Sequence, residues 1–147
     1  MDSQINTRVL VISDTHGMKF QPAEMPSQAV DVAIHCGDIT DKSTIQEYRT
    51  AIELLKGLNA PVKLVIGGNH DFTLDKSAFQ RELAGPNPPV EAIYGFPGQS
   101  RWLFDAARPH GIILLEEGTH QIRLANGALL TVYASPFTWG GKSRQGF

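Results

Sequence analysis

The stretch Val62-Lys-Leu-Val-Ile-Gly-Gly-Asn-His-Asp71 decides how the chain folds, because an apolar run ends there in two glycines and a row of polar side chains. Two other stretches have the same form: Arg8–Ser13 leads into Asp14-Thr-His16, and Val30–His35 leads into Cys-Gly-Asp38. Short apolar runs of this kind are typical of strands that are buried on both faces of a parallel sheet. We therefore predict three parallel strands, each with polar residues at its carboxyl end.

A helix is predicted between the second and third strands, which makes a β-α-β unit. Apolar residues recur there at three- and four-residue steps, at Ile45, Tyr48, Ile52, Leu55 and Leu58. Ser43 and Gln46 match a capping box at its start, and Gly57 with Pro61 ends it.

The pattern continues with helices over 75–84 and 100–108, separated by a Gly- and Pro-rich surface loop over 85–98. In the first of these helices, Phe79 and Leu83 are expected to face inward. The strand Ile112–Leu115 follows. Alternating strands over 120–124 and 128–134 flank Asn126-Gly127, a strong hairpin signal, so antiparallel strands are added to the α/β start.

The composition is that of one soluble globular domain. The chain has 147 residues, a net charge of −2 and scattered basic residues, which argues against a nucleic-acid surface. The polar start lacks the features of a signal peptide and no apolar run is long enough to span a bilayer, so we expect a cytoplasmic protein without a membrane partner. The single cysteine, Cys36, is expected to be a small buried apolar residue beside Ile34.

The polar residues at the strand ends are the candidate functional site. They are Asp14, His16, Asp38, Asp41, Asn69, His70 and Asp71. The carboxyl ends of parallel strands meet at one edge of the sheet, where α/β proteins bind ligands. Carboxylate, imidazole and amide donors together suit Mn, Fe, Zn or Ni, and a central carboxylate such as Asp38 can bridge two divalent ions.

These residues resemble the calcineurin-like metallophosphoesterases, whose pattern is D-x-H, G-D-x-x-D and G-N-H-[D/E], and the likeness is closest to the small 239AB-like branch. The expected fold is the N-terminal portion of that family's four-layer α/β/β/α sandwich. The resemblance implies two divalent metal ions. Asp14 and His16 would bind the first metal, Asp38 would bridge, and Asn69 would bind the second.

The resemblance also implies the chemistry. A metal-bridging hydroxide would hydrolyse a small phosphomonoester or phosphodiester, and His70 would act as the acid. Asp71 would hold the His70 imidazole, and Asp41 would lie behind the ligands.

The family's later lone His and G-H-x-H block have no counterpart after Asp71. His110 and His120 are expected to be a turn residue and a structural histidine. We therefore expect a domain over 1–137 that is incomplete at its C-terminus, an irregular tail over 138–147, and impaired turnover unless another chain or an oligomer complements it. The alternatives are a non-catalytic pseudoenzyme or partner-binding module and, last, a flavodoxin-like or Rossmann-type nucleotide binder, which lacks its glycine motif.

Overall fold

The computed structural model describes residues 4–138 and contains a parallel sheet of four strands in the order β1-β2-β3-β4. These strands are β1 (Val9–Ile12), β2 (Val32–His35), β3 (Val62–Val65) and β4 (Ile112–Leu114). The sequential order places the carboxyl ends of β1, β2 and β3 next to one another along a single edge. The predicted parallel sheet is confirmed.

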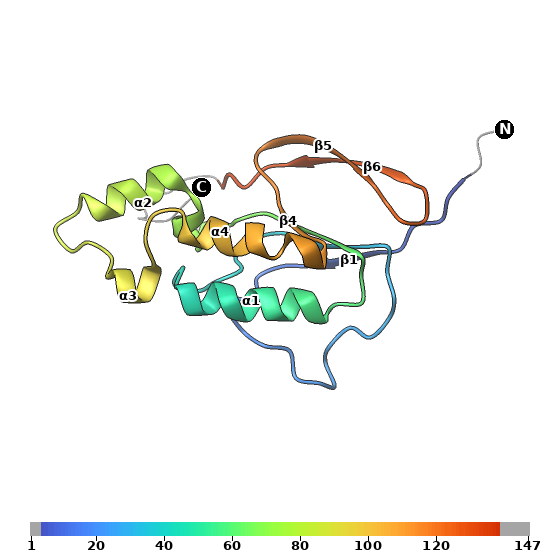
Figure 1. Cartoon of the computed structure of the whole chain (residues 1–147), viewed down its shortest axis with the longest axis horizontal. Coiled ribbons are helices and arrows are strands. Elements are labelled where there is room, and N and C mark those ends of the chain that lie inside the picture. The colour runs from blue at the N-terminus through green and yellow to red at the C-terminus, as the bar shows by residue number, and fades with distance from the viewer. Residues whose placement is uncertain (1–3, 139–147) are drawn as a thin grey trace.

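The two faces of the sheet are covered differently (Figure 1). Helices α1 (Ile45–Gly57) and α4 (Gln99–Ala106) pack on one face, where Tyr48, Leu55 and Phe104 meet the inward side chains of the strands. The hairpin of β5 (Gly118–Arg123) and β6 (Leu129–Ala134) packs on the other face through Leu124 and its neighbours. The result is a layered α/β/β arrangement, as the resemblance implied.

Strand β1 differs from the prediction that all three strands are buried on both faces. It lies at the edge of the sheet, and the side chains of Val9 and Val11 are 46% and 60% exposed. Both valines are in register with residues of β2 that pack against the hairpin, Val32 and Ile34, but the hairpin does not cover them. An edge strand has the same apolar composition as a central one, so the sequence pattern could not separate the two.

Helix α1 follows the predicted periodicity, but its capping box was assigned one residue too early. The N-cap is Thr44, whose hydroxyl accepts a hydrogen bond from the backbone N–H of Glu47, while the Glu47 carboxylate accepts one from the N–H of Thr44. Ser43 is instead buried with φ at 60°, a left-handed conformation. The helix ends where predicted, with Leu58 as its C-cap.

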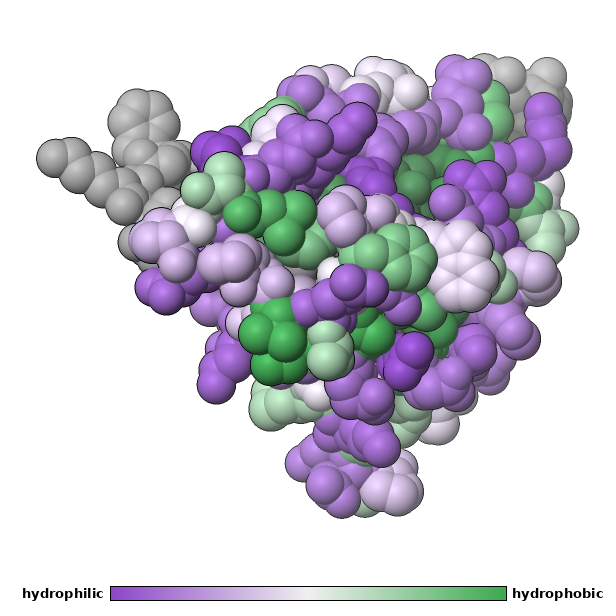
Figure 2. Space-filling view, turned by 60° about the vertical axis from the view of Figure 1, so that its left-hand side comes forward, coloured by the Kyte–Doolittle hydropathy of each residue, from purple (hydrophilic) through white to green (hydrophobic). Residues whose placement is uncertain are grey.

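The connection from β3 to β4 contains more regular structure than expected. It comprises η1 (Phe72–Leu74), α2 (Lys76–Leu83), α3 (Glu91–Tyr94), α4 and η2 (Arg108–His110), so part of the predicted surface loop is helical. Phe79 is buried as predicted, whereas Leu83 is 39% exposed. Figure 2 faces this end of the molecule and shows apolar patches on a mainly hydrophilic surface.

The hairpin turn is confirmed at Asn126-Gly127. Gly127 has φ at 92°, and the Asn126 side chain accepts a hydrogen bond from the N–H of Ala128 at 3.0 Å. Most of the predicted tail, 139–147, lies outside the described residues. Across 4–138, none of the helices has the length and apolar character needed to cross a membrane.

Candidate metal centre

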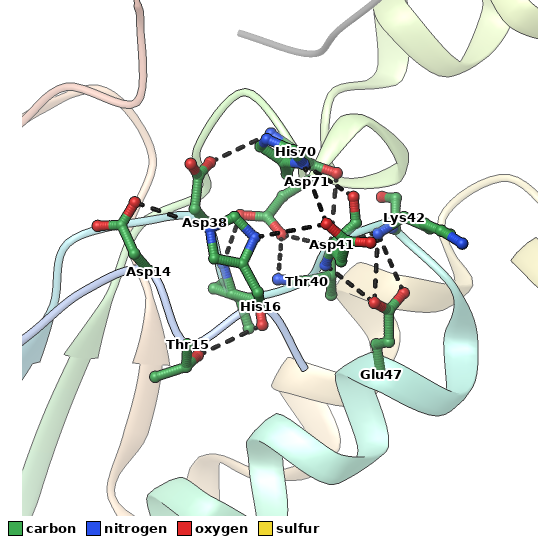
Figure 3. A network of polar contacts seen from close by, with 12 residues as sticks. Asp14, Thr15, His16, Asp38, Thr40, Asp41, Lys42, Glu47, His70 and Asp71 are labelled. Atoms are coloured by element: carbon green, nitrogen blue, oxygen red, sulfur yellow. Dashed lines mark hydrogen bonds and ion pairs between the residues drawn. The ribbon is translucent and has the colours of Figure 1, made fainter. Parts of the chain in front are cut away.

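Three loops meet at the carboxyl edge of the sheet, and Figure 3 shows their side chains converging. Asp14 and His16 follow β1, Asp38 follows β2, and Asn69 with His70 follows β3. Donor atoms of Asp14, His16 and Asp38 all lie within 4.8 Å of one another. The topology therefore brings together residues that are distant in sequence, as predicted, and Asn69 lies half-buried in the adjoining turn.

A second group of donors shares His16 with the first. His16, Asp41 and His70 also have donor atoms within 4.8 Å of one another, and the two imidazole rings meet edge to face at a centroid distance of 4.8 Å. His16 Nε2 lies 3.9 Å from Asp14 Oδ1, and its Nδ1 lies 3.8 Å from Asp41 Oδ1. One nitrogen of His16 is thus directed toward the Asp14–Asp38 side and the other toward Asp41.

The backbone at three candidate ligands is strained. The φ angles are 54° at Asp14, 47° at His16 and 49° at Asp38, in the left-handed region that L-residues rarely adopt. Each such conformation costs on the order of 1–3 kcal/mol and persists only where the surroundings enforce it. Here the backbone N–H of Asp14 donates to Gly37 O at 3.0 Å and that of His16 donates to Asp38 O at 3.1 Å. Strain concentrated on these residues is typical of a functional site.

The donor set fits a divalent transition metal. Among the residues that the structure describes, His16 Nδ1 is the one buried side-chain nitrogen or oxygen without a hydrogen-bond partner. Carboxylates commonly orient the second nitrogen of a metal-ligating histidine. Asp41 lies 3.8 Å from His16 Nδ1, a position that agrees with its predicted place behind the ligands. On the opposite side of the His16 ring, Nε2 lies with Asp14 and Asp38, which together supply nitrogen and oxygen donors.

Two glycines allow the second and third loops to approach closely. A side chain at Gly68 would collide with the carboxylate and the backbone nitrogen of Asp38. Gly37 has φ at 100°, and a Cβ there would lie 3.1 Å from Gly68 Cα. The Gly-Asp and Gly-Asn-His motifs therefore need glycine because the loops touch at these points.

His70 is held by a backbone carbonyl. Its Nδ1 lies 2.8 Å from Asp41 O, and its backbone N–H donates to Asp38 Oδ1 at 3.2 Å. The bond to Asp41 raises the pKa of His70, burial opposes that rise, and the negative charges of Asp38, Asp41 and Asp71 add to it. A protonated or readily protonated imidazole at this position suits proton donation.

Asp71 plays a different part from the one expected, because His70 Nδ1 is bonded to the Asp41 carbonyl. The Asp71 side chain is completely buried. Its carboxylate accepts hydrogen bonds from the backbone N–H groups of Ile39, Thr40 and Gly68 at 2.8–3.0 Å and from the Thr40 hydroxyl at 2.7 Å. Burial raises the pKa of Asp71, and these donated bonds oppose the rise. Asp71 therefore ties the third loop to the second.

Several supporting residues escaped the sequence analysis. His35 is 1% exposed, and burial lowers its pKa to about 4 despite the charges of Asp14 and Asp38. Its Nδ1 accepts from the N–H of Gly37 at 3.3 Å, so Nε2 carries the proton and donates to Thr15 Oγ1 at 2.8 Å.

Beneath the site, a second buried polar group consists of Thr40, Ser43, Tyr48 and Thr73. Some of these hydrogen bonds join residues that are far apart in sequence, and the others lie in segments whose sequence is that of an ordinary turn. The sequence alone therefore did not indicate them.

The remaining predictions for single residues have mixed outcomes. Cys36, which directly follows β2, is exposed and not buried as expected. His110 is an exposed residue of η2, as expected for a turn histidine. His120 is half-buried with Nε2 2.8 Å from Glu116 O, which confirms a satisfied structural histidine.

Comparison with known families agrees with this geometry. The family model described as calcineurin-like phosphoesterase matches residues 7–135, which include every strand and all the candidate ligands. The chain belongs to this family. Calcineurin-like phosphoesterases are generally metal-dependent hydrolases, and the matched range includes the converging carboxylates and imidazoles.

Relatives of this calcineurin-like phosphoesterase domain are longer proteins. The human and mouse proteins named metallophosphoesterase domain-containing protein 1 are each 36% identical over 95 residues, 65% of this chain and 26% of theirs. A protein of Emericella nidulans named probable rhamnogalacturonate lyase C is 30% identical over 131 residues, 89% of this chain and 10% of its own length. The matched segment is thus about a quarter of the length of the human and mouse proteins and a tenth of the length of the Emericella nidulans protein.

Proposed function

We propose that this chain carries the N-terminal ligands of a metal-dependent phosphoesterase that acts on a small phosphomonoester or phosphodiester. The observation that supports it most is the approach of Asp14, His16 and Asp38 within 4.8 Å at the carboxyl edge of a parallel sheet. Family membership agrees with this reaction class. We further propose that the protein acts in the cytoplasm.

The roles proposed for the residues follow their positions. Asp14 and His16 would hold one divalent ion, Asp38 would bridge to a second, and Asn69 would bind the second. Bound ions would polarise the phosphoryl group and lower the pKa of the attacking water. His70 would donate a proton to the leaving oxygen, because its backbone N–H is bonded to Asp38 and its ring, held by the Asp41 carbonyl, has a raised pKa.

Turnover is expected to be low. Among residues 4–138 the proposed set supplies three ligands to the first ion and two to the second; His110 is an exposed residue of η2, and His120 Nε2 lies 2.8 Å from Glu116 O. Sites with few protein ligands bind metals weakly and fix geometry poorly. A complementing chain or an oligomer would increase activity if it added ligands.

Hydrolysis of bis-p-nitrophenyl phosphate with Mn²⁺ tests the proposal. We expect slow, metal-dependent turnover that is lost in Asp38→Ala and kept in Asp105→Asn, a matched change of an exposed carboxylate on α4. Activity that survives Asp38→Ala would refute the site. Metal binding measured by calorimetry without any turnover would favour the alternative, a non-catalytic binding module.

A further inference from the structure

The carboxylate of Glu47, in the first turn of α1, gathers more hydrogen bonds than a helix cap requires. The capping box accounts for its bonds to Thr44: Oε2 accepts from the backbone N–H at 2.9 Å and from the hydroxyl at 2.7 Å. Oε1 accepts in addition from the N–H of Asp41 at 2.9 Å and that of Lys42 at 3.2 Å. Glu47 therefore holds the loop that follows β2 as well as the end of its own helix.

That loop determines which nitrogen of the His70 ring carries the proton. The Asp41 carbonyl, which can only accept, lies 2.8 Å from His70 Nδ1, so this nitrogen carries the proton. In the neutral ring Nε2 is then the nitrogen that carries the lone pair. The Asp41 carboxylate lies 3.8 Å from His16 Nδ1 and 3.9 Å from His70 Nδ1. The position of the Asp41 backbone thus affects both histidines.

Glu47 also contacts the first loop through its aliphatic stem. Gly17, one residue beyond His16, has φ at 70°, and a Cβ there would lie 2.8 Å from Glu47 Cγ. The Gly17 N–H donates to Ile39 O at 2.7 Å, which binds the first loop to the second. Figure 3 shows the Glu47 carboxylate beneath Asp41 and Lys42, on the side opposite His70.

We propose that Glu47 is a positioning residue: by fixing the Asp41 backbone it holds His70 as the Nδ1–H tautomer and directs Nε2 toward the reacting ester. The consequence for catalysis rests on the function proposed above, whereas the effect on the tautomer does not. The competing view is that Glu47 only caps α1.

Nitrogen NMR of the imidazole rings in the metal-free chain separates these views at alkaline pH, where His70 is neutral. We expect the Nδ1–H tautomer for His70 in the wild-type chain. Glu47→Gln keeps the shape but puts an amide NH₂ against backbone N–H groups, so it should shift His70 toward the Nε2–H tautomer. Glu47→Asp keeps the charge at the helix start but loses reach to Asp41, and should give the same shift if Glu47→Gln folds poorly.

Two control variants distinguish positioning from capping. Thr44→Ala removes the capping hydroxyl while leaving the backbone N–H bonds of Thr44, Asp41 and Lys42 to Glu47, so it should lower stability without changing the tautomer. Glu53→Gln, an exposed residue of the same helix paired with Lys56, should change neither. The proposal is overturned if Glu47→Gln and Glu47→Asp leave His70 as in the wild type, or if Thr44→Ala shifts it equally.

Kinetics supply the second readout. With Mn²⁺ and bis-p-nitrophenyl phosphate, Glu47→Gln should lower kcat by roughly 10- to 100-fold, the usual effect of removing a residue that orients the residues of a metal site, with little change in KM. Thr44→Ala should keep kcat. Absence of turnover in the wild-type chain would count against the proposed function, while the tautomer measurement would still decide the role of Glu47.

Discussion

Replacing Asp71 by asparagine should destabilise the protein even though the two side chains have nearly the same shape. The four hydrogen bonds to the Asp71 carboxylate use both oxygens twice: Thr40 donates its N–H and hydroxyl to Oδ1, and Ile39 and Gly68 donate their N–H groups to Oδ2. An amide group can accept on one side only. Its NH₂ would face the Thr40 N–H in one orientation and those of Ile39 and Gly68 in the other.

The magnitude follows from this count. One buried N–H without an acceptor costs about 1–3 kcal/mol, and each remaining bond weakens by about 1 kcal/mol when a neutral acceptor replaces a charged one. Burial of the Asp71 charge is unfavourable and raises the pKa of this carboxyl group. The neutral amide avoids that cost, which offsets part of the loss. We expect the free energy of unfolding to fall by about 2–4 kcal/mol, a large share of the ~5–15 kcal/mol typical of a domain.

Urea denaturation with a metal chelator present is the appropriate assay, because bound metal would add its own contribution to stability. Asp105→Asn is the matched control. Its side chain is 67% exposed and 3.4 Å from Arg108, so the change should cost less than about 0.5 kcal/mol. An Asp71→Asn variant as stable as this control would mean that the carboxylate does not join the loops.

Three further predictions follow from burial and close contact. As pH falls from 6.5 to about 4, unfolded His35 takes up a proton that the folded ring refuses, so urea titrations should show stability falling by up to roughly 3 kcal/mol, and less in His35→Gln. Gly68→Ala should cost about 1–3 kcal/mol in the same assay and weaken Mn²⁺ binding, because the new methyl group displaces Asp38. Gly85→Ala, where the nearest atom is 3.2 Å away, should have a much smaller effect. Val11→Lys, on the open edge of the sheet, should reduce light scattering from aggregation and change stability by less than about 0.5 kcal/mol.

The parts of the fold that could be predicted from sequence depend on local pattern. The periodicity of α1, the Asn126-Gly127 turn and the polar residues after each strand all lie within a few neighbouring residues, and each is confirmed in position. The exposure of Val11 was missed because it depends on which strand lies alongside, and no local pattern carries that information.

The same distinction applies to the site. The candidate ligands lie in short motifs, so they could be identified one loop at a time. The contacts that join the loops could not be predicted: Asp71 was identified through its motif, but its bond to Ile39 spans 32 positions, and the bond of Ser43 to Thr73 spans 30. Glu47 lay within an expected helix, where its extra bonds to Asp41 and Lys42 have no sequence signature.

These contacts divide the site into residues that support it and residues that would bind metal. The loop after β2 connects the other two. The loop after β1 is joined to it through backbone hydrogen bonds from Asp14 and His16, and the loop after β3 is joined to it through the Asp71 carboxylate. All are bonds between protein groups, so metal binding should require little ordering of the loops.

The Asp14 side chain, by contrast, is 62% exposed and lies in a group with Asp38. Asp14→Asn should therefore weaken Mn²⁺ binding in calorimetry while leaving stability unchanged or slightly higher, since it relieves repulsion between carboxylates. A loss of stability as large as that in Asp71→Asn would show that ligands and supports are not separate.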